Sequence, residues 1–407
     1  MKILMINVVC GIRSTGRICT DLADALTEQG HTVKIAYGRE QVPEKYKKYA
    51  YRIGTNLDVK LHGLKARLLD AAGFGSKRAT IKFIEWVKKY DPDVIHLHNI
   101  HGYYINVEVL FDYLRTCGKK IIWTLHDCWA FTGHSAYCDA IDCVQWISGC
   151  DKCPQKKEYP KSFLDRSKCY WKRKKMVFTR IPNLTIVTPS NWLAGLVKKS
   201  FLCNYPVQVI HNGIDTSQFH PMDNNFKSDH DIENSVMLLG VSTSWDEMKG
   251  YSDYLKLADM LGDGYRVVLV GLTKEQKENL PTNVVGIERT NSVRELAQIY
   301  SAADLFLNLS YCENYPTVNL EAVACGTPVL TYNTGGSPES ACGGIVVERG
   351  NLNAVAKELI KSKKRKKVVE IDIQQIDTRS ALNLYLQTYA SACIMNKAFK
   401  RGEEALL

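Results

Sequence analysis

The chain has 407 residues, of which 45% are hydrophobic and 24% charged, so it holds enough apolar material for two domains. This composition excludes a disordered chain, and fourteen cysteines are too few in a chain of this length for a disulfide scaffold. No apolar run reaches the roughly 20 residues of a membrane-spanning helix. Residues 1–6 also lack the cleavage pattern of a signal peptide, so we expect a cytosolic protein or one peripheral to a membrane.

The net charge of +10 is unevenly distributed. Residues 1–219 contain 33 Lys and Arg against 19 Asp and Glu, whereas residues 220–407 contain 20 against 24. The basic front half could attract nucleic acid, anionic lipid or phosphorylated ligands, and charge alone does not choose among them.

Short β-rich runs alternate with helical patterns, which predicts an α/β fold with parallel sheets. The first helix is expected over Arg17–Gln29 and should end at Gly30. A polar, aperiodic stretch at residues 220–234 predicts a linker, after which the pattern restarts. The predicted strands are Ile3–Val9, Val33–Tyr37, Val94–Leu97, Ile121–Leu125, Leu184–Thr188 and Val207–His211, then Val236–Val241, Arg266–Val270, Val284–Ile287, Leu305–Leu309, Val329–Tyr332 and Ile345–Val347.

Residues 311–328 place two glutamates around a helix start. Pro316 suits the first helical turn, so Glu313 should lie in the preceding loop and Glu321 about a turn and a half inside the helix. The amides near Thr317 and Val318 would then be available to a diphosphate. This pattern fits a nucleotide sugar, with Glu321 accepting from ribose hydroxyls and Glu313 reaching hexose hydroxyls. An isolated pair at this spacing would more often be two surface glutamates on a capped helix, so the assignment depends on further motifs.

Six further motifs accompany that segment in order along the chain. They are Ser14-Thr15-Gly16-Arg17, residues 124–133 (Thr-Leu-His-Asp-Cys-Trp-Ala-Phe-Thr-Gly), Gly149-Cys150-x-x-Cys153-Pro154, residues 211–215 (His-Asn-Gly-Ile-Asp), Lys249-Gly250 and residues 334–339 (Thr-Gly-Gly-Ser-Pro-Glu). Together they resemble the family 4 retaining glycosyltransferases of the GT-B fold. Within that family, the resemblance is strongest to the enzymes of bacterial capsular and exopolysaccharide synthesis. The resemblance covers nearly the whole chain, although no motif identifies the sugar.

The resemblance implies two Rossmann-like domains whose parallel sheets face each other across a cleft. Residues 1–212 would form the acceptor-binding domain, with a cysteine-rich insertion at about 128–160, and residues 213–378 the nucleotide-sugar-binding domain. Residues 379–407 would form a terminal helix that returns to the front domain.

The resemblance also assigns site residues. Lys249 matches the family's phosphate-binding lysine, although a plain surface lysine is the alternative. The arginine that usually precedes it is absent, since Val241-Ser242-Thr243-Ser244 follows the strand glycine, and Arg17 is a candidate substitute. Catalytic roles fall to His126, Glu313 and Lys249, and donor-binding roles to Gly16, Arg17, Lys249, Glu313, Tyr315, Thr317, Val318 and Glu321.

His126 follows a predicted strand, and resemblance suggests that it contacts the transferred sugar; a buried structural histidine is the alternative. Four polar residues, His96, His98, Asn99 and His101, crowd the end of the preceding strand, where one or two of them could line the acceptor site. Asp91-Pro92-Asp93 looks like a metal-binding Asp-x-Asp motif but precedes a strand, so we interpret it as a turn. No metal is therefore predicted for catalysis.

Four cysteines of the insertion, Cys138, Cys143, Cys150 and Cys153, could hold a structural zinc. Cys128 or His134 could replace one ligand. Buried free thiols and redox chemistry remain as alternatives.

Residues 152–180 contain eleven Lys and Arg and two acids. If they are helical, an aromatic stripe from Phe163 to Phe178 with flanking lysines could dock on anionic lipid, or could pack inside the domain. The lysine-rich run Lys361–Lys367 is expected to be a solvated connection.

These features predict a metal-independent, retaining hexosyltransferase that uses a nucleotide diphosphate sugar. We expect its acceptor to be a saccharide, linked to polyprenyl, at the inner face of the plasma membrane. Two alternatives are a nucleotide-sugar epimerase of the same fold and a zinc-stabilised nucleic-acid-binding protein.

Overall fold

A computed structural model of the chain describes residues 1–362 and 372–390. The described residues divide into two compact units, the first formed by residues 1–210 and 382–390, and the second by residues 211–362 and 372–381. None of the described helices is both long and apolar enough to cross a lipid bilayer.

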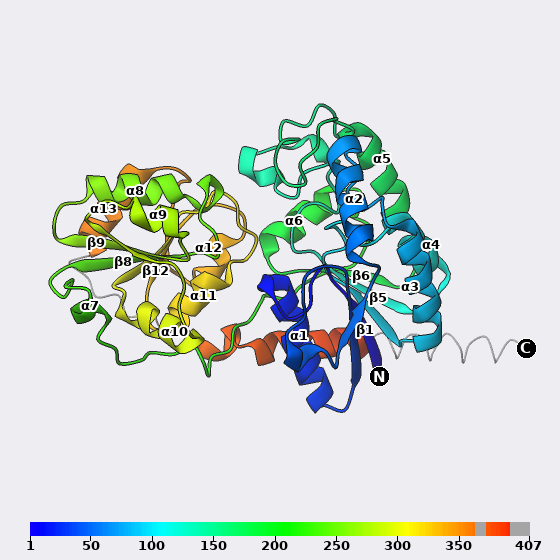
Figure 1. The fold of residues 1–407 in the computed structure, drawn as a ribbon, viewed down its shortest axis with the longest axis horizontal. Coiled ribbons are helices and arrows are strands. Elements are labelled where there is room, and N and C mark those ends of the chain that lie inside the picture. The colour runs from blue at the N-terminus through cyan, green and yellow to red at the C-terminus, as the bar shows by residue number, and fades with distance from the viewer. Residues whose placement is uncertain (363–371, 391–407) are drawn as a thin grey trace, which may run out of the picture. The chain divides into compact units, whose positions relative to one another are not determined.

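Unit 1 is built on a seven-stranded parallel sheet in the order β3-β2-β1-β4-β5-β6-β7, with helices on both faces (Figure 1). The alternation of strands and helices enforces this arrangement, because parallel neighbours need a crossover connection. The strands are β1 (Lys2–Ile6), β2 (Thr32–Tyr37), β3 (Ala50–Arg52), β4 (Val94–Leu97), β5 (Lys120–Thr124), β6 (Leu184–Thr188) and β7 (Val207–Val209). The helices are α1 (Arg13–Glu28), α2 (Asn56–Leu69), α3 (Lys77–Tyr90), α4 (Val107–Thr116), α5 (Ser167–Phe178) and α6 (Asn191–Lys199).

Unit 2 is built on a six-stranded parallel sheet in the order β10-β9-β8-β11-β12-β13. Its strands are β8 (Val236–Val241), β9 (Tyr265–Val270), β10 (Val284–Ile287), β11 (Leu305–Asn308), β12 (Val329–Tyr332) and β13 (Ile345–Val347). Its helices are α7 (Phe226–Asp229), α8 (Tyr251–Met260), α9 (Lys274–Glu278), α10 (Val293–Ala302), α11 (Thr317–Ala324), α12 (Ser337–Ser340) and α13 (Leu352–Ser362). A short 3₁₀ turn, η4 (Glu247–Lys249), precedes α8.

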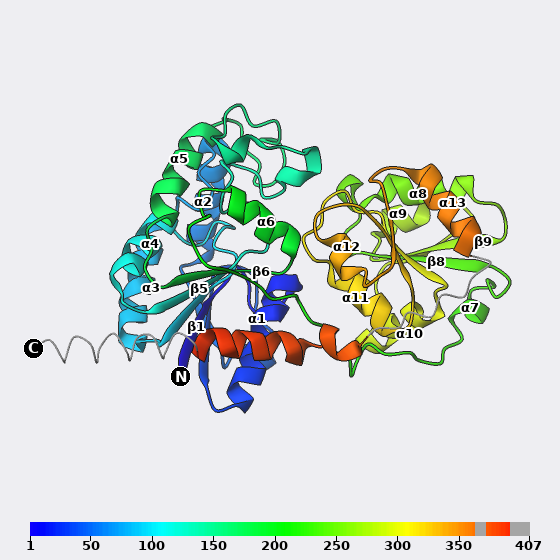
Figure 2. The ribbon, with the colours of Figure 1, turned by 180° about the vertical axis from the view of Figure 1, so that it is seen from behind.

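A helix over residues 378–390 ends the described chain, and its later part belongs to unit 1. It lies beside α1 in both ribbon views (Figure 2). The Tyr389 hydroxyl lies 2.8 Å from His96 Nδ1, and the Tyr385 hydroxyl lies 3.1 Å from Thr124 Oγ1. These buried contacts reach the strands β4 and β5.

The predicted α/β class and the repeated parallel sheets are confirmed, with local differences. The strand β3 was not predicted, β1 and β7 end earlier than expected, and α1 begins at Arg13 instead of Arg17. The short helix α7 lies within the predicted linker, and β5 and β11 end one residue earlier than predicted. Asp91 and Asp93 lie in the turn before β4 as predicted, and Asp93 accepts a hydrogen bond from the Lys2 amide. Most of the run Lys361–Lys367 falls outside the described residues.

The helix α5 packs into the unit, which favours the alternative that its aromatic stripe packs inside the domain, whereas Phe163 and Leu164 before the helix are exposed. Tyr170, Trp171 and Phe178 are buried with the rest of the core, and Lys174 is buried as well. The Lys174 ammonium donates to the carbonyls of Trp129 and Thr132 and lies 3.7 Å from the centre of the Trp129 ring. Because burial desolvates the ammonium, the pKa of Lys174 falls to about 7.

Candidate active site

The central feature of unit 2 is the helix α11, which begins directly after the loop that follows β11. Pro316 occupies the N-cap in an extended conformation, and its side chain makes no capping hydrogen bond. The helix ends before Gly326, whose φ of +82° is the left-handed stop that the sequence predicts. The first-turn amides at Thr317 and Val318 lie on half-buried residues, as an anion-binding helix terminus requires.

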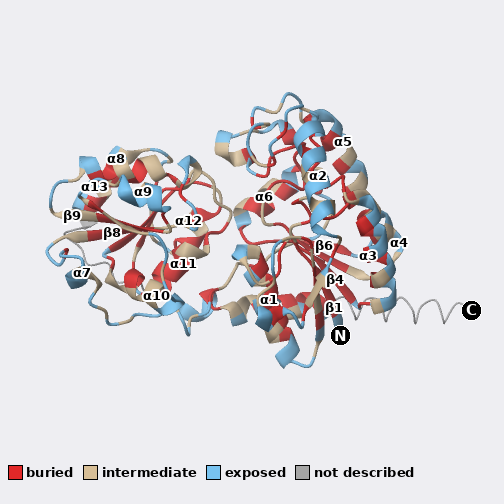
Figure 3. Ribbon diagram, viewed as in Figure 1, coloured by how far each residue is buried: buried red, intermediate tan, exposed pale blue. Residues whose placement is uncertain are grey.

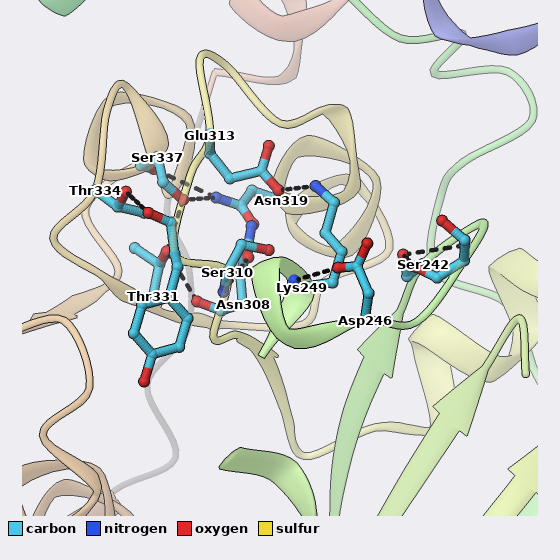
Figure 4. A network of polar contacts seen from close by, with 12 residues as sticks. Ser242, Asp246, Lys249, Asn308, Ser310, Glu313, Asn319, Thr331, Thr334 and Ser337 are labelled. Carbon is cyan, nitrogen blue, oxygen red and sulfur yellow. Dashed lines mark hydrogen bonds and ion pairs between the residues drawn. The ribbon is translucent and has the colours of Figure 1, made fainter. Parts of the chain in front are cut away.

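Lys249 and Glu313 form an ion pair beside this helix (Figure 4). The Lys249 Nζ lies 2.5 Å from Glu313 Oε1, and the lysine side chain keeps 36% of its surface exposed. Burial alone would lower the pKa of Lys249, but the Glu313 carboxylate outweighs that effect and raises it above the ordinary value. Lys249 is therefore a cation at neutral pH with part of its surface open to a ligand.

The chain holds both residues of this pair by backbone contacts. Gly250 has a φ of +73°, and a Cβ there would lie 2.2 Å from the Leu309 carbonyl oxygen, so only glycine lets η4 lie against the end of β11. The Tyr311 amide also donates to the Met248 carbonyl over 2.9 Å. These contacts therefore hold residues 246–250 against the loop after β11.

The motif Thr334-Gly335-Gly336 supports the same loop from its other side. The Thr334 hydroxyl donates to the Tyr311 carbonyl over 3.0 Å, and the Gly336 amide donates to the Glu313 carbonyl over 3.3 Å. A Cβ on Gly335 would lie 1.5 Å from the Glu313 carbonyl oxygen. This close approach explains why a glycine follows β12.

A buried polar network fixes the first turn of α11 to its neighbours (Figure 4). The Asn319 amide nitrogen donates to the hydroxyls of Ser337 and Ser340, and the Asn319 carbonyl oxygen accepts from Asn308 over 2.9 Å. The Thr331 hydroxyl lies 2.6 Å from that of Ser337. Because buried polar groups that are satisfied on every side resist movement, this network makes the helix start rigid.

Glu321 lies in the next turn of α11 and is 8% exposed. The Tyr300 hydroxyl of α10 donates to Glu321 Oε2 over 3.0 Å. Burial and the neighbouring carboxylate both raise the pKa of Tyr300 well above its ordinary value, so the hydroxyl stays protonated and keeps donating. Tyr315, in the loop before the helix, stacks on His211 with ring centres 4.7 Å apart.

Unit 1 collects a second polar cluster at the carboxyl ends of β4 and β5. His126 is half-buried, and its Nε2 lies 3.1 Å from Nδ1 of the buried His98. His101 Nε2 lies 2.8 Å from Asp127 Oδ2, and these side chains line one small cavity. Burial lowers the pKa of His126 to about 4, although Asp127 opposes the shift, so His126 is neutral at pH 7.

Gly16 and Arg17 lie inside α1, because the helix begins four residues earlier than predicted. Gly16 is buried, its carbonyl accepts from the Gly11 amide over 3.1 Å, and a Cβ would lie 3.0 Å from Val9 Cγ2. The absence of a side chain at Gly16 therefore serves packing against the loop after β1, whereas Arg17 is exposed.

The cysteine-rich segment does not assemble four close thiols. Cys138 is buried with the core, while Cys143, Cys150 and Cys153 are half-buried and near enough to influence one another's charge. Burial raises the pKa of Cys150 to about 12 and that of Cys153 to about 11. Within residues 1–362 and 372–390, no group of three or more His, Cys, Asp or Glu side chains is placed to hold a metal ion. The structural zinc stays a prediction.

Three partners of the site were not found from the sequence. Tyr300 and Asn308 lie on other elements and meet α11 only after folding, so no local pattern marks them. Asn319 lies between Glu313 and Glu321 in the sequence. A polar residue inside the apolar helix α11 was the one sequence signal that could have indicated its role.

Comparisons with known proteins give the same architecture. The chain superposes on sucrose-phosphate synthase from Thermosynechococcus elongatus with a TM-score of 0.63 and 17% identity, over 99% of each chain. It superposes on Anabaena HepE in complex with UDP with a TM-score of 0.66 and 14% identity, over 96% of this chain and all of HepE. The two parallel α/β units thus have the GT-B fold.

Sequence relationships define the class and then the family. Residues 223–372 match the model for glycosyl transferases group 1, so the protein is a glycosyltransferase. Residues 15–218 match the model for glycosyltransferase family 4, and the chain belongs to that family. It is 24% identical to WcaC, a colanic acid biosynthesis glycosyl transferase of Escherichia coli K12, over 83% of this chain and 85% of WcaC.

Proposed function

We propose that the protein is a retaining, metal-independent hexosyltransferase that uses a nucleotide diphosphate sugar. The Lys249–Glu313 pair beside the start of α11, where the N-cap residue Pro316 makes no side-chain capping hydrogen bond, is the observation that carries this proposal. A cation and backbone amides at a helix start would suit a pyrophosphate, and the nearby carboxylates could accept hydrogen bonds from sugar hydroxyls, which supports this proposal.

In the proposed reaction, the bond between the anomeric carbon and the phosphate oxygen breaks, and the nucleoside diphosphate leaves with the electron pair. The acceptor oxygen attacks the anomeric carbon from the same face and passes its proton to the departing phosphate. Negative charge builds on the diphosphate, so Lys249 and the first-turn amides at Thr317 and Val318 stabilise the transition state. These fixed positive groups supply the charge stabilisation without a divalent metal.

The other residues position the two substrates. Glu321 accepts from the ribose hydroxyls, and Tyr300 keeps its carboxylate oriented. Glu313 accepts from the hexose hydroxyls, and the neutral His126 bonds to the transferred sugar. Gly16 and Arg17 remain proposed donor contacts, with the exposed Arg17 as the second cation.

The similar proteins suggest the substrates. HepE of Anabaena has been solved with UDP and with UDP-glucose, which supports a uridine diphosphate sugar as the first donor to test. WcaC is described as a colanic acid biosynthesis enzyme, which supports a saccharide of capsule or exopolysaccharide assembly as the acceptor. We propose that the acceptor is polyprenyl-linked and that the enzyme works in the cytoplasm at the inner membrane face.

The test is a panel of nucleotide sugars assayed for hydrolysis and for transfer, with Lys249→Ala, Glu313→Ala and Glu321→Ala beside the wild type. Each substitution should lower turnover of the preferred donor by roughly 10²-fold or more. Lys277→Ala and Glu288→Ala are matched controls, because they break a surface ion pair of the same unit and should change little. Unchanged turnover in all three site variants would reject the assignment.

A further inference from the structure

The helix α2 in unit 1 exposes a row of large apolar side chains. Leu57, Leu61, Leu64 and Leu68 are 64%, 57%, 55% and 45% exposed. Their spacing of four, three and four residues puts them on one narrow stripe, since a helix turns about 100° per residue. Figure 3 shows the ribbon of α2 largely in the colour of exposed residues.

The inner face of this helix is fixed by polar contacts. His62 is 1% exposed, its Nδ1 lies 3.0 Å from the Ser76 hydroxyl, and its Nε2 accepts from the Gly75 amide over 3.0 Å. Ala66, one turn later, is also buried. The helix thus buries a histidine and exposes four leucines, which is the reverse of what water alone would favour.

Both ends of α2 are also held, so the helix cannot rotate to bury the leucines. Thr55 and Asp58 form a capping box at its start. Asp70, the left-handed C-cap residue, pairs with His134 and accepts from the Arg166 amide. The outward direction of the stripe is therefore a fixed property of unit 1.

A second exposed apolar segment continues the stripe at the end of α2. Phe163 and Leu164 are 64% and 52% exposed, and the Phe163 amide donates to the Arg67 carbonyl over 2.8 Å. The Arg67 guanidinium lies 5.2 Å from the centre of the Phe163 ring. The four leucines together with Phe163 and Leu164 are called the α2 stripe below.

Basic side chains border the α2 stripe. Lys60 and Arg67 flank the leucines on one side of the helix and Lys65 on the other, and all three are exposed. Lys161 and Arg166, which are exposed as well, border Phe163 and Leu164. An apolar row bordered by cations complements a bilayer that carries anionic headgroups over an apolar interior.

We propose that the α2 stripe is the surface by which this protein docks on an anionic lipid bilayer. The inference deepens the proposed function, which places the enzyme beside a lipid-linked acceptor, and it replaces α5 with a different element. The leucines and Phe163 enter the headgroup region, and the lysines and arginines contact lipid phosphates.

Flotation with phosphatidylcholine vesicles, with and without 30% phosphatidylglycerol, tests this docking. Wild type should float mainly with the anionic vesicles. The triple variant Leu61→Gln/Leu64→Gln/Leu68→Gln should bind the anionic vesicles at least roughly tenfold more weakly than wild type. Met260→Gln/Ile360→Gln, which removes two exposed apolar side chains of unit 2, is the matched control and should float like wild type.

A charge-reversal pair tests the contribution of the border. Lys60→Glu/Arg67→Glu should weaken binding to anionic vesicles roughly tenfold or more, whereas Lys198→Glu/Lys199→Glu on α6 should change it far less. Hydrogen exchange of wild type, with and without vesicles, gives a readout that needs no variant. Residues 56–69 and 161–164 should gain protection.

Three results would overturn the docking proposal. They are unchanged flotation of the leucine variant, vesicle-induced protection confined to other segments, and a wild-type dimer that the leucine variant converts to monomer, since the stripe would then cover a second copy. Nucleotide-sugar hydrolysis without vesicles separates the two proposals. The leucine variant should keep it, and Lys249→Ala should lose hydrolysis while it keeps flotation.

Discussion

The Lys249 ammonium lies 2.5 Å from the Glu313 carboxylate, although the two residues are 64 positions apart in the chain. The contact joins the turn before α8 to the loop before α11. If both side chains serve one donor site, the free-energy effects of substituting them should not be additive. We expect Lys249→Met to lower kcat by roughly 10²- to 10³-fold. We expect the Lys249→Met/Glu313→Gln double variant to be less impaired than the product of the two single effects, measured by steady-state kinetics. Multiplicative effects would show that the two residues act in separate sites.

Gly335 should be essential for donor binding because of its close contact with the Glu313 carbonyl, and not only because of its positive φ. Gly335→Ala would drive a Cβ into the Glu313 carbonyl, whereas at Gly343, which also has a positive φ, a Cβ meets nothing within 4 Å. Both substitutions carry the left-handed cost of roughly 1–2 kcal/mol. Only Gly335→Ala should also abolish donor binding, measured by calorimetry. Equal affinity in the two variants would contradict the supporting role of the loop.

The hydroxyl of Tyr300 should matter for donor affinity as well as for stability. Tyr300→Phe removes a donor from the buried Glu321 carboxylate and should cost about 1–3 kcal/mol of the free energy of unfolding. Tyr254→Phe is the matched control, because the Tyr254 hydroxyl is buried too but donates to the Leu307 carbonyl. Both variants should lose stability, and only Tyr300→Phe should raise the donor KM. A similar rise of KM in both would indicate a general loosening of unit 2.

Acid should destabilise unit 1 through its buried histidines. Burial lowers the pKa of His62 to about 4, of His96 to about 3 and of His126 to about 4. The unfolded chain takes up these protons near pH 6.5 and the folded chain does not, so stability is complete above about pH 6.5 and falls below it. The slope should be about 1.4 kcal/mol per pH unit for each such histidine. Denaturant melts of wild type and His62→Gln between pH 5 and 7 should show a shallower slope for the variant. A free energy of unfolding that does not change between pH 5 and 7 in wild type would be inconsistent with these shifts.

The proposed mechanism predicts that transfer needs no divalent metal ion. Transfer should proceed at the same rate within about twofold with and without added Mg²⁺ or Mn²⁺, because Lys249 and the α11 amides carry the charge stabilisation. An absolute need for either ion would contradict the proposed mechanism.

Elemental analysis tests the structural zinc predicted at Cys138, Cys143, Cys150 and Cys153, and a zinc content well below one equivalent would count against it.

Much of the fold could be predicted because its signals are local. The strand Val236–Val241 is a continuous apolar run, Val94–Leu97 is apolar except for His96, and the limits of both are as predicted. The strand β3 has only three residues, none of them buried, so it lacks that signal. The sequence pattern also set the turn at Pro316 and the stop at Gly326, since proline and glycine restrict the backbone by themselves.

What depends on tertiary contact could not be predicted. The basic aromatic stripe of α5 looked suited to lipid, but which face of a helix is buried depends on neighbours such as Trp129, over whose ring Lys174 lies. The leucines of α2 look like a core stripe until the structure shows His62 on the inner side. The bond from Tyr300 to Glu321 likewise joins two helices, and no spacing in the sequence marks it.

A crystal structure with the preferred nucleotide sugar bound tests the central claim most directly. The diphosphate should lie against the amides of Thr317 and Val318 within hydrogen-bonding distance of Lys249, with Glu321 bonded to the ribose. A donor bound away from the first turn of α11, with Lys249 still paired only to Glu313, would contradict the account.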